Sequence, residues 1–209
     1  MSTITKLTEN YIDEHKSIKE CLKKGLINYS ALSRKIIKEL NLSKKVSKEA
    51  ILVASRRYKE KIKTKHSDEE IFSLFKKSNI EIKNNIMVFT LDKNIYPDSL
   101  IEIEKKIKES SGLFFGIEGT KSITIIVQNK NKELILKRFK NNLLSKKEEL
   151  SLITLTSEGI WEVPGAVNYI SGLFFENGIN IEEFMSCHDD TLIVINSRDV
   201  EKTIRFLRF

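Results

Sequence analysis

The chain has 209 residues, 40% of them hydrophobic and 31% charged, and its formal net charge is +7. This composition can support a buried core and argues against a disordered chain. No stretch approaches the ~18 uncharged apolar residues of a membrane-spanning helix, and the first residues lack the apolar run of a signal peptide. We therefore expect a cytoplasmic protein with no membrane partner, in which the two isolated cysteines are buried thiols without a disulfide.

The charge is unevenly distributed along the chain. Between residues 16 and 65 there are 16 Lys and Arg against 4 Asp and Glu. Between residues 145 and 209 there are 6 basic residues against 11 acidic ones. A strongly basic segment favours a polyanionic partner such as nucleic acid, and an acidic segment does not. The two ends of the chain are therefore expected to have different partners.

Residues 1–84 predict a basic helical domain. Side chains spaced at i, i+4, i+7 and i+11 from Tyr11 to Leu22 lie on one face of a single helix, and Gly25 follows its end. Further helices are expected to begin at residues that commonly cap an N-terminus. These are Asn28 or Ser30, Ser47, and Ser67.

The helix that follows Asn28 or Ser30 and the helix that follows Ser47 together resemble a helix-turn-helix or winged-helix scaffold. The helix after Ser47 would be the recognition helix, because its outer face carries cations suited to guanine and phosphate contacts. The link between the two helices is longer than the usual turn, and no hairpin wing follows. DNA binding, a helical dimerisation or packing module, and RNA binding therefore all remain open. The candidate nucleic-acid contacts are Arg56, Lys59 and Lys63, with Arg57 at the edge.

The rest of the chain contains two copies of one pattern, offset by 66–67 residues. Its only two prolines, Pro97 and Pro164, each follow a short apolar strand and open a helix, as a proline can without loss of a helical hydrogen bond. Two strands and a second helix follow in each copy. Each copy buries one sheet face under its helices and leaves strand edges open, so pairing of the copies is expected. The predicted units span residues 85–144 and 145–209.

Four segments of the second copy form a recognisable pattern: Ser151–Leu155, Pro164–Val167, Gly178–Ile181 and Thr191–Ile195. In these residues the second copy resembles the ACT domain found at the C-terminus of aspartokinases. The first copy matches the same outline weakly, with Asp98 where the family pattern has glycine. The resemblance implies an α+β fold, in which each unit is ferredoxin-like, and the binding of an amino acid or similar effector between paired units.

The resemblance also implies a ligand site in the second unit. A helix N-terminus suits a carboxylate, Gly165 allows close approach to the backbone, and Asn180 can both donate and accept hydrogen bonds. In the alternative interpretation, Pro164 and Gly165 only turn the chain, and Asn180 only satisfies a local backbone group. The implied ligand-binding residues are Glu158, Gly159, Val163, Pro164, Gly165 and Ala166 on one side, and Asn180 and Ile181 on the other.

The fourth strand of each ferredoxin-like unit is not evident. After the last predicted helix only a few residues remain, so the second unit has either a very short strand or one exchanged with its neighbour. The region around Leu143 and Leu144 could complete the first unit.

These features predict a non-catalytic, dimeric regulatory protein that senses an amino acid or related metabolite through paired ACT units. Its output would be transcription, through DNA binding, or assembly with a partner enzyme. The alternative is a structural dimerisation protein, or a regulatory subunit with no small-molecule ligand. We find no candidate catalytic residue, metal-ligand set or cofactor motif.

Overall fold

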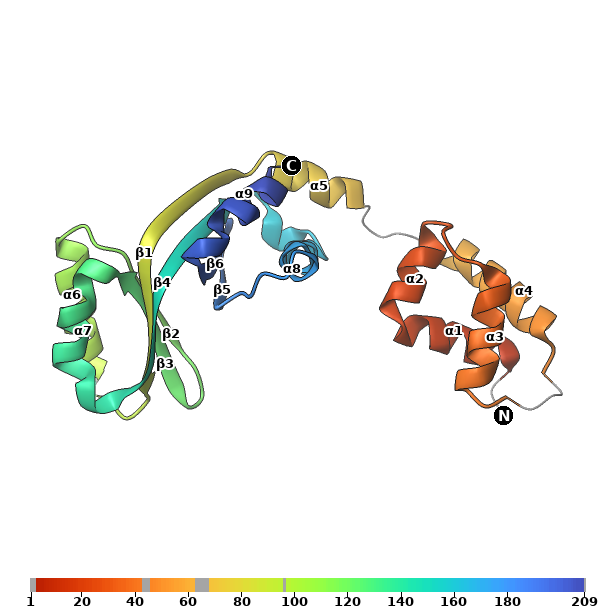
Figure 1. Cartoon of the computed structure of the whole chain (residues 1–209), viewed down its shortest axis with the longest axis horizontal. Helices are drawn as coiled ribbons and strands as arrows, with labels where there is room; N and C mark the ends of the chain where they lie inside the picture. The colour runs from red at the N-terminus through yellow and green to blue at the C-terminus, as the bar shows by residue number, and fades with distance from the viewer. Residues whose placement is uncertain (1–2, 43–45, 63–67, 96, 209) are drawn as a thin grey trace. The chain divides into compact units, whose positions relative to one another are not determined.

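The computed structural model describes residues 3–42, 46–62, 68–95 and 97–208, with the side chains of all but 68–70 (Figure 1). The chain forms two compact units, Met1–Lys65 and His66–Phe209. We call them the helical unit and the sheet unit. In the described ranges, no helix has both the length and the apolar character needed to cross a membrane.

The helical unit contains two helices where the sequence predicts one. The backbone breaks at His15 (φ −113°, ψ 86°), between the first two helices. The predicted caps Asn28 and Ser47 are confirmed, because each side chain accepts from a backbone N–H three residues on, at 3.0 and 3.4 Å. Ser67 lies outside the described residues. The helices are α1 (Ile4–Glu14), α2 (Lys16–Lys23), α3 (Tyr29–Glu39) and α4 (Lys48–Lys61).

The sheet unit is one six-stranded antiparallel sheet with the strand order β2-β3-β1-β4-β6-β5. Figure 1 shows the two long central strands, β1 and β4, arching between the two hairpins. Its elements are α5 (Asp68–Lys76), β1 (Asn79–Asp92), α6 (Pro97–Glu109), β2 (Phe114–Glu118), β3 (Ser122–Gln128), α7 (Lys132–Phe139), β4 (Leu143–Thr156), α8 (Ala166–Glu176), β5 (Glu183–Cys187), β6 (Asp190–Asn196) and α9 (Val200–Leu207).

The predicted end of the first domain at residue 84 is wrong, because the compact units divide after Lys65. Ile71 and Phe75 of α5 are buried in the core of the second repeat. Residues 79–83 are the first half of β1, where they pair with residues 152–156 of β4. The buried residues of α5 therefore belong to the core of the sheet unit.

Each repeat obtains its fourth strand from the other repeat's long strand. The second half of β1 is the first strand of repeat one, and the first half of β4 pairs with it as a fourth strand, with Leu143 opposite Leu91. The expectation that this region completes the first unit is confirmed. The second repeat is completed by residues 79–83, and its C-terminal residues continue as α9.

A backbone irregularity lies at the middle of each long strand. Ile80 and Ile82 pack against the core under α8 and α9, whereas Met87 and Phe89 pack under α6 and α7. This change of parity needs an extra residue, which is supplied at Asn85 (φ +58°), where the pairing with β4 shifts register. Glu149 (φ +58°) occupies the matching place in β4.

The opposite face of the sheet also carries a buried apolar cluster. Phe115 of β2 and Met185 of β5 pack against it from the two outer strands. The cluster therefore joins the two repeats across the curved sheet. Its buried members are Ile86, Val88, Ile126, Leu150, Leu152, Leu192 and Val194.

Several local predictions are corrected by the structure. Pro97 is the first residue of α6, as expected, but Pro164 precedes α8 by two residues because Gly165 adopts φ +98° as its N-cap. The strand predicted from Ile179 begins only at Glu183. Both cysteines, expected to be buried, are exposed.

Candidate functional site

The connection between β4 and α8 forms the first half of the predicted ligand site. It is held by the turn between β5 and β6: the backbone N–H of Ser157 donates to the Asp189 carbonyl at 2.8 Å, and the N–H of Gly159 donates to Asp189 Oδ1 at 3.0 Å. The hydroxyl of Ser157 also hydrogen-bonds that of Ser78, which follows α5. The loop is therefore fixed from two sides before any ligand arrives.

Gly165 is the residue of this loop with the strongest backbone requirement. Its φ of +98° is a conformation that L side chains rarely adopt, and a Cβ there would lie 3.4 Å from Ile71 Cδ1 of α5. Pro164 and Gly165 are exposed, Val163 is half-buried and Ala166 is buried at the start of α8. The backbone N–H of Ala166, the first of α8, donates to the Val163 carbonyl at 3.2 Å. The helix start also carries a partial positive charge, so this position suits a carboxylate.

The same loop also carries acidic and aromatic side chains. Glu158 and Glu162 are exposed, and the chain's single tryptophan, Trp161, is 59% exposed with its ring 5.7 Å from that of His188. A helix start beside carboxylates offers opposite charges over a short distance. That arrangement matches a zwitterion, whose carboxylate and ammonium groups need opposite partners.

Asn180 and Ile181 form the predicted second half, in the connection before β5. The amide of Asn180 donates to Glu182 Oε1 at 3.0 Å, and Glu182 Oε2 pairs with Lys147 Nζ at 2.5 Å. The hydrogen bonds from Lys147 and Asn180 lower the pKa of the Glu182 carboxyl. Ile181 packs against the core of the second repeat. The Asn180 side chain is thus engaged locally, although with a carboxylate and not with the backbone.

The structure does not bring the two halves together within one copy of the repeat. Strand β5 runs parallel to β4, since both pair antiparallel with β6. Glu183 is level with Leu152 across β6, so Asn180 lies beside the middle of β4, whereas the Glu158–Ala166 loop follows the end of β4. The five residues of β5 separate them by about 13 Å of strand. One small molecule cannot contact both halves of a single copy.

Sequence reasoning misses the residues that hold the loop. The sequence indicates only a surface turn at Asp189, and it places Ser78 and Ile71 in the helical domain. The only available signal is a polar residue in a turn, which is common between strands. The role of these residues depends on β5, β6 and α5 meeting the loop, which is a property of the fold.

The predicted nucleic-acid contacts lie on α4. Arg56 and Arg57 are exposed, and the Arg56 guanidinium lies 5.4 Å from the centroid of the Tyr29 ring. Lys59 is half-buried, and Lys63 lies outside the described residues. The two arginines are thus available on one side of the helix, with one of them partly engaged in a cation–π contact.

We also searched the described ranges for side chains that could bind a metal ion. Among the residues that the structure describes, no group of three or more His, Cys, Asp or Glu side chains is placed to hold a metal ion.

Comparison with known proteins gives structural neighbours only. No protein-family model matches the chain, and no curated protein matches it. An aspartate kinase from Clostridium acetobutylicum, described as an allosteric enzyme, aligns over 62% of this chain with a TM-score of 0.52 and 17% identity. The aligned part spans 34% of that kinase, about a third of its length.

Two smaller structures align over most of their own length. The aspartokinase alpha and beta subunits match 62% of this chain and 90% of theirs, with a TM-score of 0.51 and 14% identity. The regulatory subunit of aspartate kinase from Thermus flavus matches 61% of this chain and 94% of its own, with a TM-score of 0.51 and 10% identity. These likenesses concern the fold: this chain has the aspartokinase-type ACT fold, as the sequence predicts, together with a separate helical unit.

Proposed function

We propose that this chain is a regulatory protein that senses an amino acid or a related small zwitterion through the β4–α8 loop of its second ACT unit. The observation that carries the proposal is Gly165, an exposed glycine with φ +98° at the start of α8. Its backbone is open to a ligand's carboxylate, and Glu158 provides a carboxylate for an ammonium group. The fold shared with aspartate kinase regulatory subunits supports a regulatory role.

The contact between Gly165 and α5 suggests how binding would be transmitted. Ile71 lies beside Gly165, and Ser78 hydrogen-bonds Ser157 of the same loop. A ligand that binds one arrangement of the loop more tightly than another shifts the population of α5 positions by that difference in affinity. Because α5 directly follows the helical unit in the chain, it is the element through which the output would change.

The separation of the two halves makes a dimeric site part of the proposal. Asn180 and Ile181 of a second copy would complete the site at the loop of the first. This matches the pairing of ACT units that the sequence predicts.

Trp161 provides a direct test, because it is the only tryptophan and lies in the loop. We would titrate the full chain with each of the twenty amino acids and follow tryptophan fluorescence and thermal unfolding. A ligand at ~100 times its dissociation constant adds about 2.7 kcal/mol of stability. One amino acid should change both signals, and Gly165→Val should abolish the response. If no amino acid changes either signal, the sensing proposal is wrong and the structural alternative gains support.

Two variants refine the experiment. Asp98→Ala changes the matching position of the first repeat and should leave the response intact. Asn180→Ala should weaken the response only if a second copy completes the site, so its effect distinguishes a dimeric site from a loop that binds alone.

We also propose, as the output, that the helical unit binds DNA through α4. The observation that favours it is the exposed Arg56–Arg57 pair within a strongly basic segment. Arg56→Glu with Arg57→Glu should abolish retention of duplex DNA, measured by anisotropy at several salt concentrations. Lys6→Glu with Lys38→Glu makes the same charge change at exposed positions on α1 and α3, and should weaken retention much less. Equal losses of DNA retention in the two double variants would indicate non-specific attraction of DNA to a basic unit. That result would contradict α4 as the recognition helix.

A further inference from the structure

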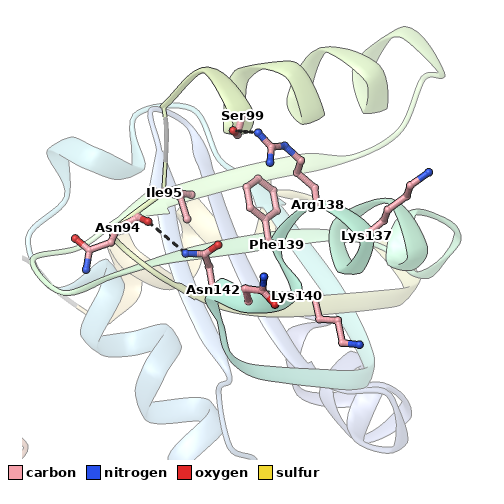
Figure 2. A pocket seen from close by; sticks show the side chains of 9 residues that line it. Asn94, Ile95, Ser99, Lys137, Arg138, Phe139, Lys140 and Asn142 are labelled. Atoms are coloured by element: carbon pink, nitrogen blue, oxygen red, sulfur yellow. Dashed lines mark hydrogen bonds between the residues drawn. The ribbon is translucent and has the colours of Figure 1, made fainter.

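The first repeat contains a pocket that the proposed sensing function does not use. It has a volume of about 310 Å³, near the lower limit of small-molecule sites. Asn94 and Ile95 line it from the connection after β1, and Ser99 lines it from the start of α6. The remaining wall is the end of α7 and the turn before β4, residues 137–142 (Figure 2).

The lining of this pocket is cationic. Lys137, Arg138 and Lys140 contribute three positive charges, and no Asp or Glu is among the described residues that line it. In the described part of the chain, neither lysine makes an ion pair. The pKa of the Glu102 carboxyl is lowered mainly by its hydrogen bond to Lys106, with which it pairs at 2.5 Å, and to a smaller extent by the charge of Arg138. The described residues that line the pocket therefore carry an excess of positive charge.

Two of the polar groups are held in place. Arg138 donates to Ser99 Oγ and lies 5.9 Å from the centroid of the Phe139 ring. Across the pocket, Asn142 Nδ2 donates to the Asn94 carbonyl at 3.2 Å. Figure 2 shows Phe139 between these two groups. Arg138 uses few of its five N–H donors in these contacts, so it retains donors for an oxyanion.

The helix ends around the pocket do not account for its charges. Cations at the end of α7 also complement the partial negative charge of a helix C-terminus, about half an elementary charge. The start of α6, at Ser99, contributes a partial positive charge of similar size on the opposite wall. The two helix ends nearly cancel, and three full charges remain.

The second repeat provides an internal comparison. With Phe206 matching Phe139, the positions of Lys137 and Lys140 are occupied by Ile204 and Leu207, and Leu207 is 1% exposed. Arg138 corresponds to Arg205, which pairs with Glu201 at 2.5 Å. The same framework thus carries apolar residues at the two lysine positions in one repeat and a cationic pocket in the other. Because α9 ends without lysines at these positions, the partial negative charge of a helix C-terminus does not by itself explain Lys137 and Lys140 at the end of α7.

From this arrangement we infer that the first repeat binds a small multivalent oxyanion, a phosphate- or carboxylate-bearing metabolite, in the pocket that Arg138, Asn94 and Asn142 line. The two lysines stand at the rim, where their long side chains can follow anions of different size. The inference does not depend on the loop site of the second repeat.

The test is calorimetric titration of the full chain with inorganic pyrophosphate and with citrate, at constant ionic strength in chloride buffer. The two anions distinguish a phosphate from a carboxylate preference. Saturable binding is expected for at least one of them, about tenfold weaker in Lys137→Gln with Lys140→Gln and in Arg138→Gln. Trp161 fluorescence should not change, because the tryptophan lies in the other repeat.

Lys121→Gln with Lys130→Gln is the matched control, since it removes the same charge at two exposed positions of the first repeat outside the pocket. It should bind as tightly as the unchanged chain. The lysine pair at the rim is exposed, so its removal should leave folding intact even if Arg138→Gln does not fold. No saturable binding of either anion, or equal binding by the rim and control variants, would overturn the inference. The latter result would assign the anion to the basic helical unit.

Discussion

The two repeats of the sheet unit share one topology but differ at the ends of their helices. In the first repeat, the α6 start and the α7 end enclose a pocket lined by Lys137, Arg138 and Lys140. In the second, α5 packs against the start of α8, and Leu207 is buried. Residues 85–144 carry 10 basic against 7 acidic side chains, and residues 145–209 carry 6 against 11. The two repeats thus share one sheet framework, while their helix ends differ in charge and in the elements that cover them.

The largest expected effect tests whether α5 is an integral part of the second repeat. Phe75 is 1% exposed and stacks on Tyr169 with ring centroids 5.7 Å apart. Phe75→Ala should destabilise the sheet unit by about 3–5 kcal/mol in chemical denaturation, through lost burial and the cavity that remains. Ile101→Ala, at an exposed position of α6, should change stability by less than about 0.5 kcal/mol. A small loss at Phe75 would mean that α5 is only loosely attached.

A smaller effect tests the backbone requirement at Gly165 against that at Gly172, inside α8. Because Gly165 has φ +98°, Gly165→Ala should destabilise by about 1–2 kcal/mol. At Gly172, inside α8, a Cβ would meet no neighbouring atom within 4 Å, so Gly172→Ala should stabilise by about 0.5–1 kcal/mol. Thermal unfolding of the two variants should therefore shift in opposite directions. Equal shifts would contradict the backbone argument.

The smallest effect concerns the ion pair that joins the repeats, between Lys147 in β4 and Glu182 before β5. The pKa of Glu182 is lowered in the folded chain, so its stabilisation is present above its unfolded pKa and is lost as the pH falls through the folded value. Glu182→Gln should reduce stability at neutral pH by about 0.2–1 kcal/mol and flatten the acid dependence. Burial raises the pKa of the neighbouring Glu183, so Glu183→Gln should alter the acid dependence with the opposite sign. Urea unfolding between pH 3 and 7 measures both.

The sequence predicts the repeats well because both depend on local signals. Alternating apolar residues, prolines before helices and glycine turns recur in both copies. The structure confirms the order of the strands and helices that they predict, with later starts for α8 and β5. Even the completion of the first unit by Leu143 and its neighbours follows from the apolar pattern at that position.

The predictions from sequence are wrong where tertiary packing, and not a local pattern, determines the structure. Asn84 and Asn85 are polar and turn-prone, so they suggest a linker, yet Asn85 is an extra residue inside a strand and Ser151 Oγ donates to Asn84 Oδ1 at 2.8 Å. The amphipathic face of α5 fits either unit on sequence grounds. The relation between Asn180 and the loop depends on the direction of β5, which no local pattern specifies.

The shared long strands also determine the order in which the chain can fold during synthesis. Asn79 pairs with Thr156, and the last strand to be made, β6, pairs beside that same half of β4. The first half of β1 therefore leaves the ribosome long before its partner exists, with unpaired backbone groups on both edges. Such non-local pairing is slow. The helices and the hairpin of the first repeat can form early, whereas the sheet closes only when nearly the whole chain is available.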